Sequence, residues 1–139
     1  PNKKDENWRF TDLSSIKKGS FRISEKKDAP NADYNISGYE LDSLKTVVFF
    51  NGHFQESLST LPKRVRVISN QEYMEQNDWA LSQPTKSSFD LLNTAFMDSG
   101  VSIIVERCIQ INEPIRLLFI CSGDEKLMTS PRIHVDVGE

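Results

Sequence analysis

The sequence predicts a mainly β fold with helices: a mixed α/β N-terminal region over residues 1–97, followed by a run of short strands over residues 98–139. Two observations predict it. A hairpin signal and helix-type apolar spacings fall before residue 97, and apolar residues alternate repeatedly after residue 100. The 139 residues suffice for one domain, or for one small unit plus the start of another, with a real core.

A short helix is predicted near the N-terminus. Thr11 can cap it, and Asp12 is favourable in its first turn. Leu13 and Ile16 are three residues apart and are expected to point inward, and Gly19 ends the helix.

The strongest local signal is Asn51-Gly52, which separates the apolar runs 47–50 and 53–55. Both central residues of a tight hairpin turn need positive φ, so this pair predicts a β-hairpin. Val65 and Val67 alternate with polar residues and predict a further strand. Residues 24–38 show no period and are predicted to form a surface loop.

Two further helices are predicted, each from a capping pattern. Ser69-x-x-Glu72 predicts a helix to about residue 81, and Ser87-x-x-Asp90 predicts a second one. The first helix is expected to bury Tyr73, Met74, Ala80 and Leu81. The second carries an apolar stripe at Phe89, Leu92 and Phe96.

After residue 100 apolar residues alternate in four sets. They are Val101/Ile103/Val105, Ile109/Ile111, Ile115/Leu117/Phe119 and Ile133/Val135/Val137. Such strands fit a sandwich, a barrel or a stacked β-helix, and the period alone does not choose among them. A stacked solenoid needs a cap on its last turn, and none is visible before Glu139. We therefore expect a fragment with an uncovered apolar edge, and self-association through that edge.

Charge indicates no nucleic-acid surface. The formal net charge is −3, although residues 1–27 hold eight basic and four acidic side chains. Basic residues interleaved with aromatics on one face would indicate nucleic-acid binding, and a solvated surface is the favoured interpretation here. Neither a signal peptide nor a membrane-spanning stretch is evident, so no membrane partner is expected.

The chain has two histidines and two cysteines, and their spacing is not that of a metal site. Cys108 and Cys121 are predicted to be reduced, buried thiols in a protein of a reducing compartment. His53 and His134 are isolated in the sequence. Contact of Cys121 with His134 across neighbouring strands remains open as a weak site.

Two further features of the sequence have both a functional and a structural interpretation. Trp8 suits a partner contact, but an aromatic anchor that docks the N-terminal helix is favoured. Asp124-Glu125-Lys126 contains paired carboxylates, but a solvated loop is favoured over acid–base chemistry. No Gly-rich phosphate loop occurs. We therefore predict no catalytic, cofactor-binding or metal-binding residue in this chain.

One resemblance rests on three stretches of the sequence: residues 6–13, 47–54 and 89–96. Together they resemble the SufB/SufD family of iron–sulfur cluster assembly proteins. Residues 6–13 (Glu-Asn-Trp-Arg-Phe-Thr-Asp-Leu) resemble a signature near the start of the SufD branch. Residues 47–54 resemble the strand, turn and strand that follow it. Residues 89–96, leading through Gly100 to Pro114, resemble the helix that enters a right-handed parallel β-helix. Residues 20–45 match nothing in the family pattern.

The resemblance implies a scaffold subunit and not an enzyme. It implies that the last part, residues 98–139, is the truncated start of a right-handed parallel β-helix. The partners implied for the full-length protein are SufB and SufC, in the cytoplasm or the plastid stroma. The cluster is handled by the whole complex, and no cofactor is expected in this fragment. The family's functional residues lie further along, so none is transferred here.

Two alternatives from other classes remain. One is a free-standing, small, β-rich binding module. The other is a β-helix enzyme acting on polysaccharides, which would need clustered acidic or basic side chains and aromatic sugar platforms; Phe119 is the one aromatic residue after Gly100.

Overall fold

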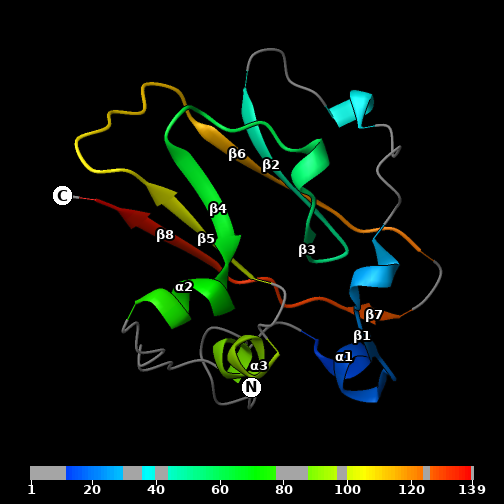
Figure 1. Cartoon of the computed structure of the whole chain (residues 1–139). Coiled ribbons are helices and arrows are strands. Elements are labelled where there is room, and N and C mark those ends of the chain that lie inside the picture. The colour runs from blue at the N-terminus through cyan, green and yellow to red at the C-terminus, as the bar shows by residue number, and fades with distance from the viewer. Residues whose placement is uncertain are drawn as a thin grey trace.

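A computed structural model describes residues 12–29, 36–39, 44–77, 88–96, 100–123 and 126–138. The described part is mixed α/β, with mostly strands in three small sheets (Figure 1). The strands are β1 Arg22–Ile23, β2 Lys45–Phe50, β3 His53–Phe54, β4 Val65–Ser69, β5 Val101–Val105, β6 Ile115–Ile120, β7 Leu127–Met128 and β8 Ile133–Val137. The α-helices are α1 Ser14–Lys18, α2 Asn70–Gln76 and α3 Ser88–Ala95, and the 3-10 helices are η2 Lys26–Asp28, η3 Ser37–Tyr39 and η4 Glu56–Leu58.

The predicted hairpin is confirmed. β2 pairs antiparallel with β3, and the turn residues Asn51 and Gly52 have φ of 45° and 86°. Both therefore lie in the left-handed region, which Asn and Gly tolerate better than other residues. The predicted strand after Pro62 is β4, which pairs antiparallel with β5.

Each of the three sheets contains one parallel pair. β2 pairs with β6, β5 with β8, and β1 with β7. From β5 the chain runs through β6 and β7, each in another sheet, and then returns to lie beside β5 as β8. The β2–β6 and β1–β7 pairs join residues from both sides of the predicted boundary at 97/98, whereas β5 and β8 both follow it; the boundary stays a prediction.

The main core lies between the two three-stranded sheets. Its buried members are Val47, Phe49, Val65, Val101, Ile103 and Val105. A second cluster of Val48, Phe50 and Ile120 lies on the opposite face of β2. Because β2 is apolar on both faces, residues 46–50 are all buried.

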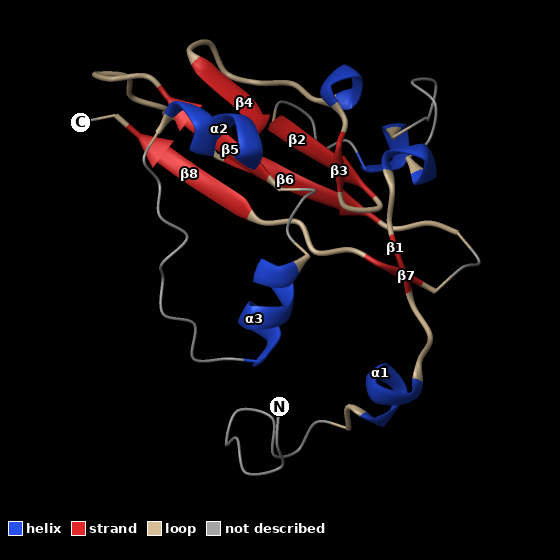
Figure 2. Ribbon diagram, turned by 60° about the horizontal axis from the view of Figure 1, so that its bottom comes forward, coloured by secondary structure: helices blue, strands red, loops and turns tan. Residues whose placement is uncertain are grey.

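The helices cover the sheets unequally. α2 lies across the β4–β5–β8 sheet, whereas α1 and α3 stand away from the strands (Figure 2). The predicted cap of α2 is confirmed, because the Glu72 N–H donates to Ser69 Oγ at 3.0 Å. This helix buries Tyr73 and ends at Gln76, while Ala80, Leu81 and Ser87 lie outside the described residues.

Three sequence predictions need correction. Ile16 is exposed on α1, which buries no residue. Asp12 lies before the helix and not in its first turn, where its carboxylate accepts from the Ser14 N–H; the predicted cap Thr11 lies outside the described residues. Ile109 and Ile111 form no strand: they lie in a loop after the left-handed Cys108 and pack against the main core. The positive φ at Cys108 interrupts the extended backbone, so no strand forms here. The two isoleucines instead hold the loop against the core.

Candidate interaction surface

The last three described strands each form one edge of a different sheet; the opposite edges are β3, β1 and β4. β6, β7 and β8 each pair with a neighbour on one side among the described residues. Their other edges present backbone donors and acceptors that no described strand pairs. An edge of this kind is a template for another strand.

Apolar side chains on two of these strands continue the main core outward. Phe119 lies in register with Phe49, and their rings stack at a centroid distance of 4.8 Å and an interplanar angle of 13°. Val137 lies in register with Val105. The inner residues are 0% and 8% exposed, and the outer ones 47% and 60%. We call the four outer side chains, Leu117, Phe119, Val135 and Val137, the β6–β8 apolar surface.

The outer face of the β4–β5–β8 sheet differs, because α2 covers it with buried polar contacts. Ser102 Oγ donates to Asn70 Oδ1 at 2.8 Å, and Asn70 Nδ2 donates to the Arg132 carbonyl at 2.9 Å. Ser102 and Asn70 are 0% and 3% exposed. A Cβ at Gly100 would clash with the Arg132 carbonyl and Asn70 Nδ2, so only glycine fits there.

Tyr73 completes this contact. Its hydroxyl donates to Asp136 Oδ2 at 2.8 Å, and its ring lies 4.7 Å from the His134 ring. The hydrogen bond to Asp136 raises the pKa of the Tyr73 hydroxyl, and burial acts in the same direction. His134 is therefore part of the helix-to-sheet packing, directly beside its register partner Ser102 on the neighbouring strand.

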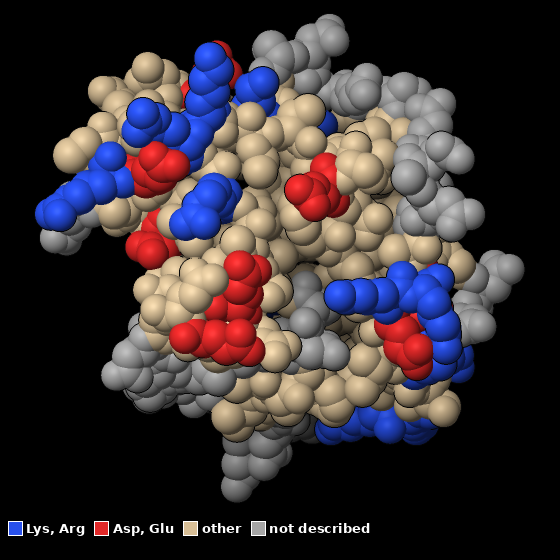
Figure 3. Space-filling model, viewed as in Figure 1, with Lys and Arg blue, Asp and Glu red and all other residues tan. Residues whose placement is uncertain are grey.

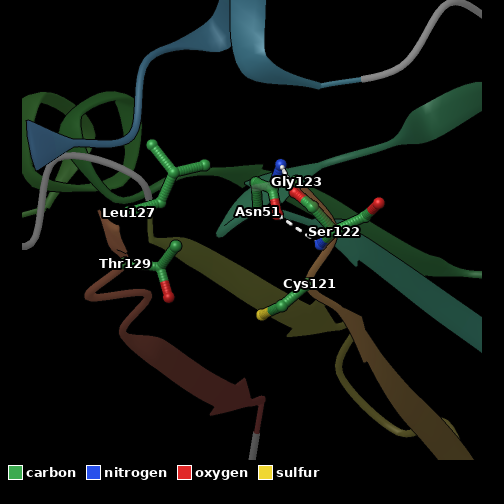
Figure 4. A pocket seen from close by; sticks show the side chains of 6 residues that line it. All are labelled: Asn51, Cys121, Ser122, Gly123, Leu127 and Thr129. Carbon is green, nitrogen blue, oxygen red and sulfur yellow. Dashed lines mark hydrogen bonds between the residues drawn. The ribbon is translucent and has the colours of Figure 1, made fainter. Parts of the chain in front are cut away.

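A pocket lies just past the ends of β2 and β6, beside β7. Asn51, Cys121, Ser122, Gly123, Leu127 and Thr129 line it. Figure 4 shows the Cys121 thiol and the Thr129 hydroxyl on this pocket, with the Asn51 carboxamide bonded to Ser122. The pocket has a volume of about 180 Å³.

The prediction of buried cysteines is wrong. Both are free thiols, but both are exposed. Cys108 occupies a left-handed turn position at φ 60°, just after β5 ends. Cys121 follows the last residue of β6 and turns toward the pocket. Each cysteine belongs to an apolar stretch of sequence that continues beyond the end of its strand. The last residue of each strand is buried, whereas the residues from there to the cysteine are exposed.

The other candidate residues remain separate. Within the described ranges, no group of three or more His, Cys, Asp or Glu side chains is able to hold a metal ion. Cys121 lines the pocket, while His134 packs on Tyr73 under α2. His53 is half-buried beside Phe50 in the hairpin. Trp8, Asp124 and Glu125 lie outside the described residues.

Charged side chains form separate groups on the face drawn in Figure 3. They gather near the end of the β4–β5 pair, over α2, and over residues 22–28, with uncharged surface between them. The 22–28 group contains the Arg22–Asp28 ion pair at 2.7 Å, and the β4–β5 group contains the Arg64–Glu106 pair at 3.3 Å. No single basic stripe joins these groups on this face.

None of the described helices is both long and apolar enough to cross a bilayer. The parallel strand pairs and the core that continues into an uncovered apolar surface are typical of a fold in which strands stack in successive layers.

Comparison with known proteins points to one family. No protein-family model matches this sequence. The chain is 31% identical, over 147 residues, to an iron-sulfur cluster assembly SufBD family protein of Synechocystis. The match takes in 99% of this chain, which spans about a third (32%) of that relative's length. This similarity supports the SufB/SufD family and does not separate the two subunits.

Proposed function

We propose that this chain is the N-terminal part of SufD and contributes to iron–sulfur cluster assembly. The observation that carries the proposal is the similarity to the SufBD family protein over nearly the whole chain. The signature at residues 6–13 resembles SufD more than SufB, and favours that subunit.

The parallel pairs support the start of a right-handed parallel β-helix. The chain runs from β5 through β6 and β7 and returns as β8 beside β5. In this arrangement β6 lies parallel and in register with β2, and β8 with β5. Crossovers between parallel strands of one sheet are right-handed in about 98% of cases, which favours that hand here. The β6–β8 apolar surface would then be covered by the next circuit in the full-length protein.

The proposed role is that of a scaffold and not of an enzyme. The full-length protein would bind SufB and SufC, with the cluster held by the complex and no cofactor bound in this part. In the isolated chain the β6–β8 apolar surface would instead support self-association. The proposed location is the cytoplasm or the plastid stroma, because both compartments are reducing and both cysteines are free thiols.

Complementation tests the assignment. The full-length protein is expressed with an affinity tag in a bacterial strain that lacks its own SufD, and separately in one that lacks SufB. We expect recovery of iron–sulfur enzyme activity in the first strain alone, together with co-purification of SufB and SufC. Recovery of the strain lacking SufB alone would assign the other subunit. Absence of recovery and of co-purification in both strains would overturn the proposal.

A further inference from the structure

Asn51 has a second feature besides its turn conformation: its carboxamide connects three segments. Nδ2 donates to the Asp28 carbonyl at 2.9 Å and to the Ser122 carbonyl at 3.0 Å. Oδ1 accepts from the Ser122 N–H at 3.0 Å, and the Asn51 N–H donates to the Ile120 carbonyl at 2.8 Å. The dashed lines in Figure 4 mark the contacts with Ser122. We call this set of bonds the Asn51 brace.

The same residue begins the one Asn-Gly dipeptide of the sequence. Asparagine before glycine is chemically labile, because a residue without a side chain leaves its backbone nitrogen open. That nitrogen attacks the asparagine Cγ, ammonia leaves, and a five-membered succinimide forms. Water then opens the ring to aspartate or isoaspartate, so the overall change is the replacement of an amide NH₂ by OH.

The folded chain opposes each part of this reaction. Asn51 is 4% exposed and Gly52 is buried, so the water that must open the ring has little access. The brace holds Cγ in place through both of its heteroatoms. Asp28 is itself fixed, because the Arg22 guanidinium donates to both of its carboxylate oxygens at 2.7 and 2.9 Å.

We infer that Asn51 is a deamidation site that the fold keeps closed and that local or global opening exposes. The change is one-way for this structure. A carboxylate has no N–H to donate, so after conversion its oxygen would face the carbonyls of Asp28 and Ser122. Chains that spend time unfolded thus accumulate a product that lacks the two Nδ2 hydrogen bonds of the Asn51 brace, to Asp28 and to Ser122.

The first test uses the unmodified chain. It is held in mildly alkaline buffer with and without denaturing urea, and the peptide containing position 51 is followed by mass spectrometry. We expect conversion to be at least about tenfold slower in the folded chain, because reaction requires prior opening. Asn112 is the internal control: it is followed by glutamate, and should stay intact in both conditions. Equal rates at position 51 in the two conditions would overturn the inference.

The second test loosens one anchor of the brace. Arg22→Ala removes the support of Asp28 and should raise the rate of conversion in the folded chain. Lys27→Ala is the matched control, since Lys27 pairs with Glu25 on the surface at 2.9 Å and does not touch Asp28 in that pair. If Arg22→Ala does not fold, the rate for the unmodified chain at urea concentrations below the unfolding transition replaces it. If neither Arg22→Ala nor urea below the unfolding transition raises the rate of Asn51 conversion, the inference that the fold protects Asn51 is wrong.

Discussion

The inner and outer strands of the parallel pairs have the same kind of sequence but opposite environments. β2 and β5 are buried along almost their whole length, while β6 and β8 expose alternate apolar side chains. Ile103 is 4% exposed, and its register partner Val135 is 56% exposed. Apolar alternation therefore predicts that one face of a strand is suited to packing. Whether that face is covered depends on how many further strands stack beside it.

The largest expected effect on stability comes from truncating a buried side chain on an inner strand. Phe49→Ala removes a ring from the centre of the main core and should lower the free energy of unfolding by about 3–5 kcal/mol. Phe119→Ala removes a half-exposed ring and should cost about 1 kcal/mol. Urea unfolding followed by circular dichroism measures both. Equal losses would mean that β6 is as deeply packed as β2, against the exposures reported above.

The outer strands should matter more for association than for stability. We expect the isolated chain to self-associate with rising concentration, and the double variant Phe119→Ser/Val135→Ser to weaken that association. Leu91→Ser on α3 is the matched control, because Leu91 is also apolar and exposed. Sedimentation velocity over a concentration series measures the effect. A clean monomer at high concentration, or equal association of both variants, would remove the β6–β8 apolar surface as the contact.

The smallest effect is expected away from the two three-stranded sheets, at the ion pair between Arg22 on β1 and Asp28. The Arg22 hydrogen bonds, with a further one from the Glu25 N–H, hold the pKa of Asp28 well below its usual range. A carboxyl whose pKa is lower in the folded chain stabilises it above the unfolded pKa of about 4 and loses this contribution as the pH falls through the folded value.

Arg22→Ala should therefore destabilise the chain more at about pH 7 than at about pH 2, because at the lower pH the Asp28 carboxyl is protonated in the unfolded chain and folding of the wild type has to release that proton. Urea unfolding of wild type and Arg22→Ala at the two pH values measures the difference, with Lys17→Ala, an exposed basic residue of α1, as a control for lost surface charge. A difference that is independent of pH would show that Arg22 acts through packing alone.

Local chemistry explains which elements were predictable. The hairpin needs positive φ at two neighbouring residues, and Asn51-Gly52 supplies it. The start of α2 needs an acceptor at its first turn, and Ser69 supplies that. Both requirements are met within a few residues, so a short window of sequence is enough to detect them.

The candidate surface was predictable in kind, as an uncovered apolar edge, but its members were not. No local signal told Phe119 from Phe49, or showed that Cys121 lies beyond the strand on a pocket. The polar contacts of Asn70 and Ser102 under α2 were missed altogether. An asparagine at a helix start and a serine in an otherwise apolar strand were the signals available, and each has several common explanations.

By itself the sequence determined the hairpin, the helix start, the alternating strands and the resemblance to a family. Only the tertiary structure decided that β1, β2 and β5 each acquire a parallel partner from later in the chain, and that α2 covers one sheet face. The physical reason is that turns and caps are satisfied by neighbours in sequence. Burial depends on which distant segments stack, and the same alternating pattern suits an inner strand and an outer one.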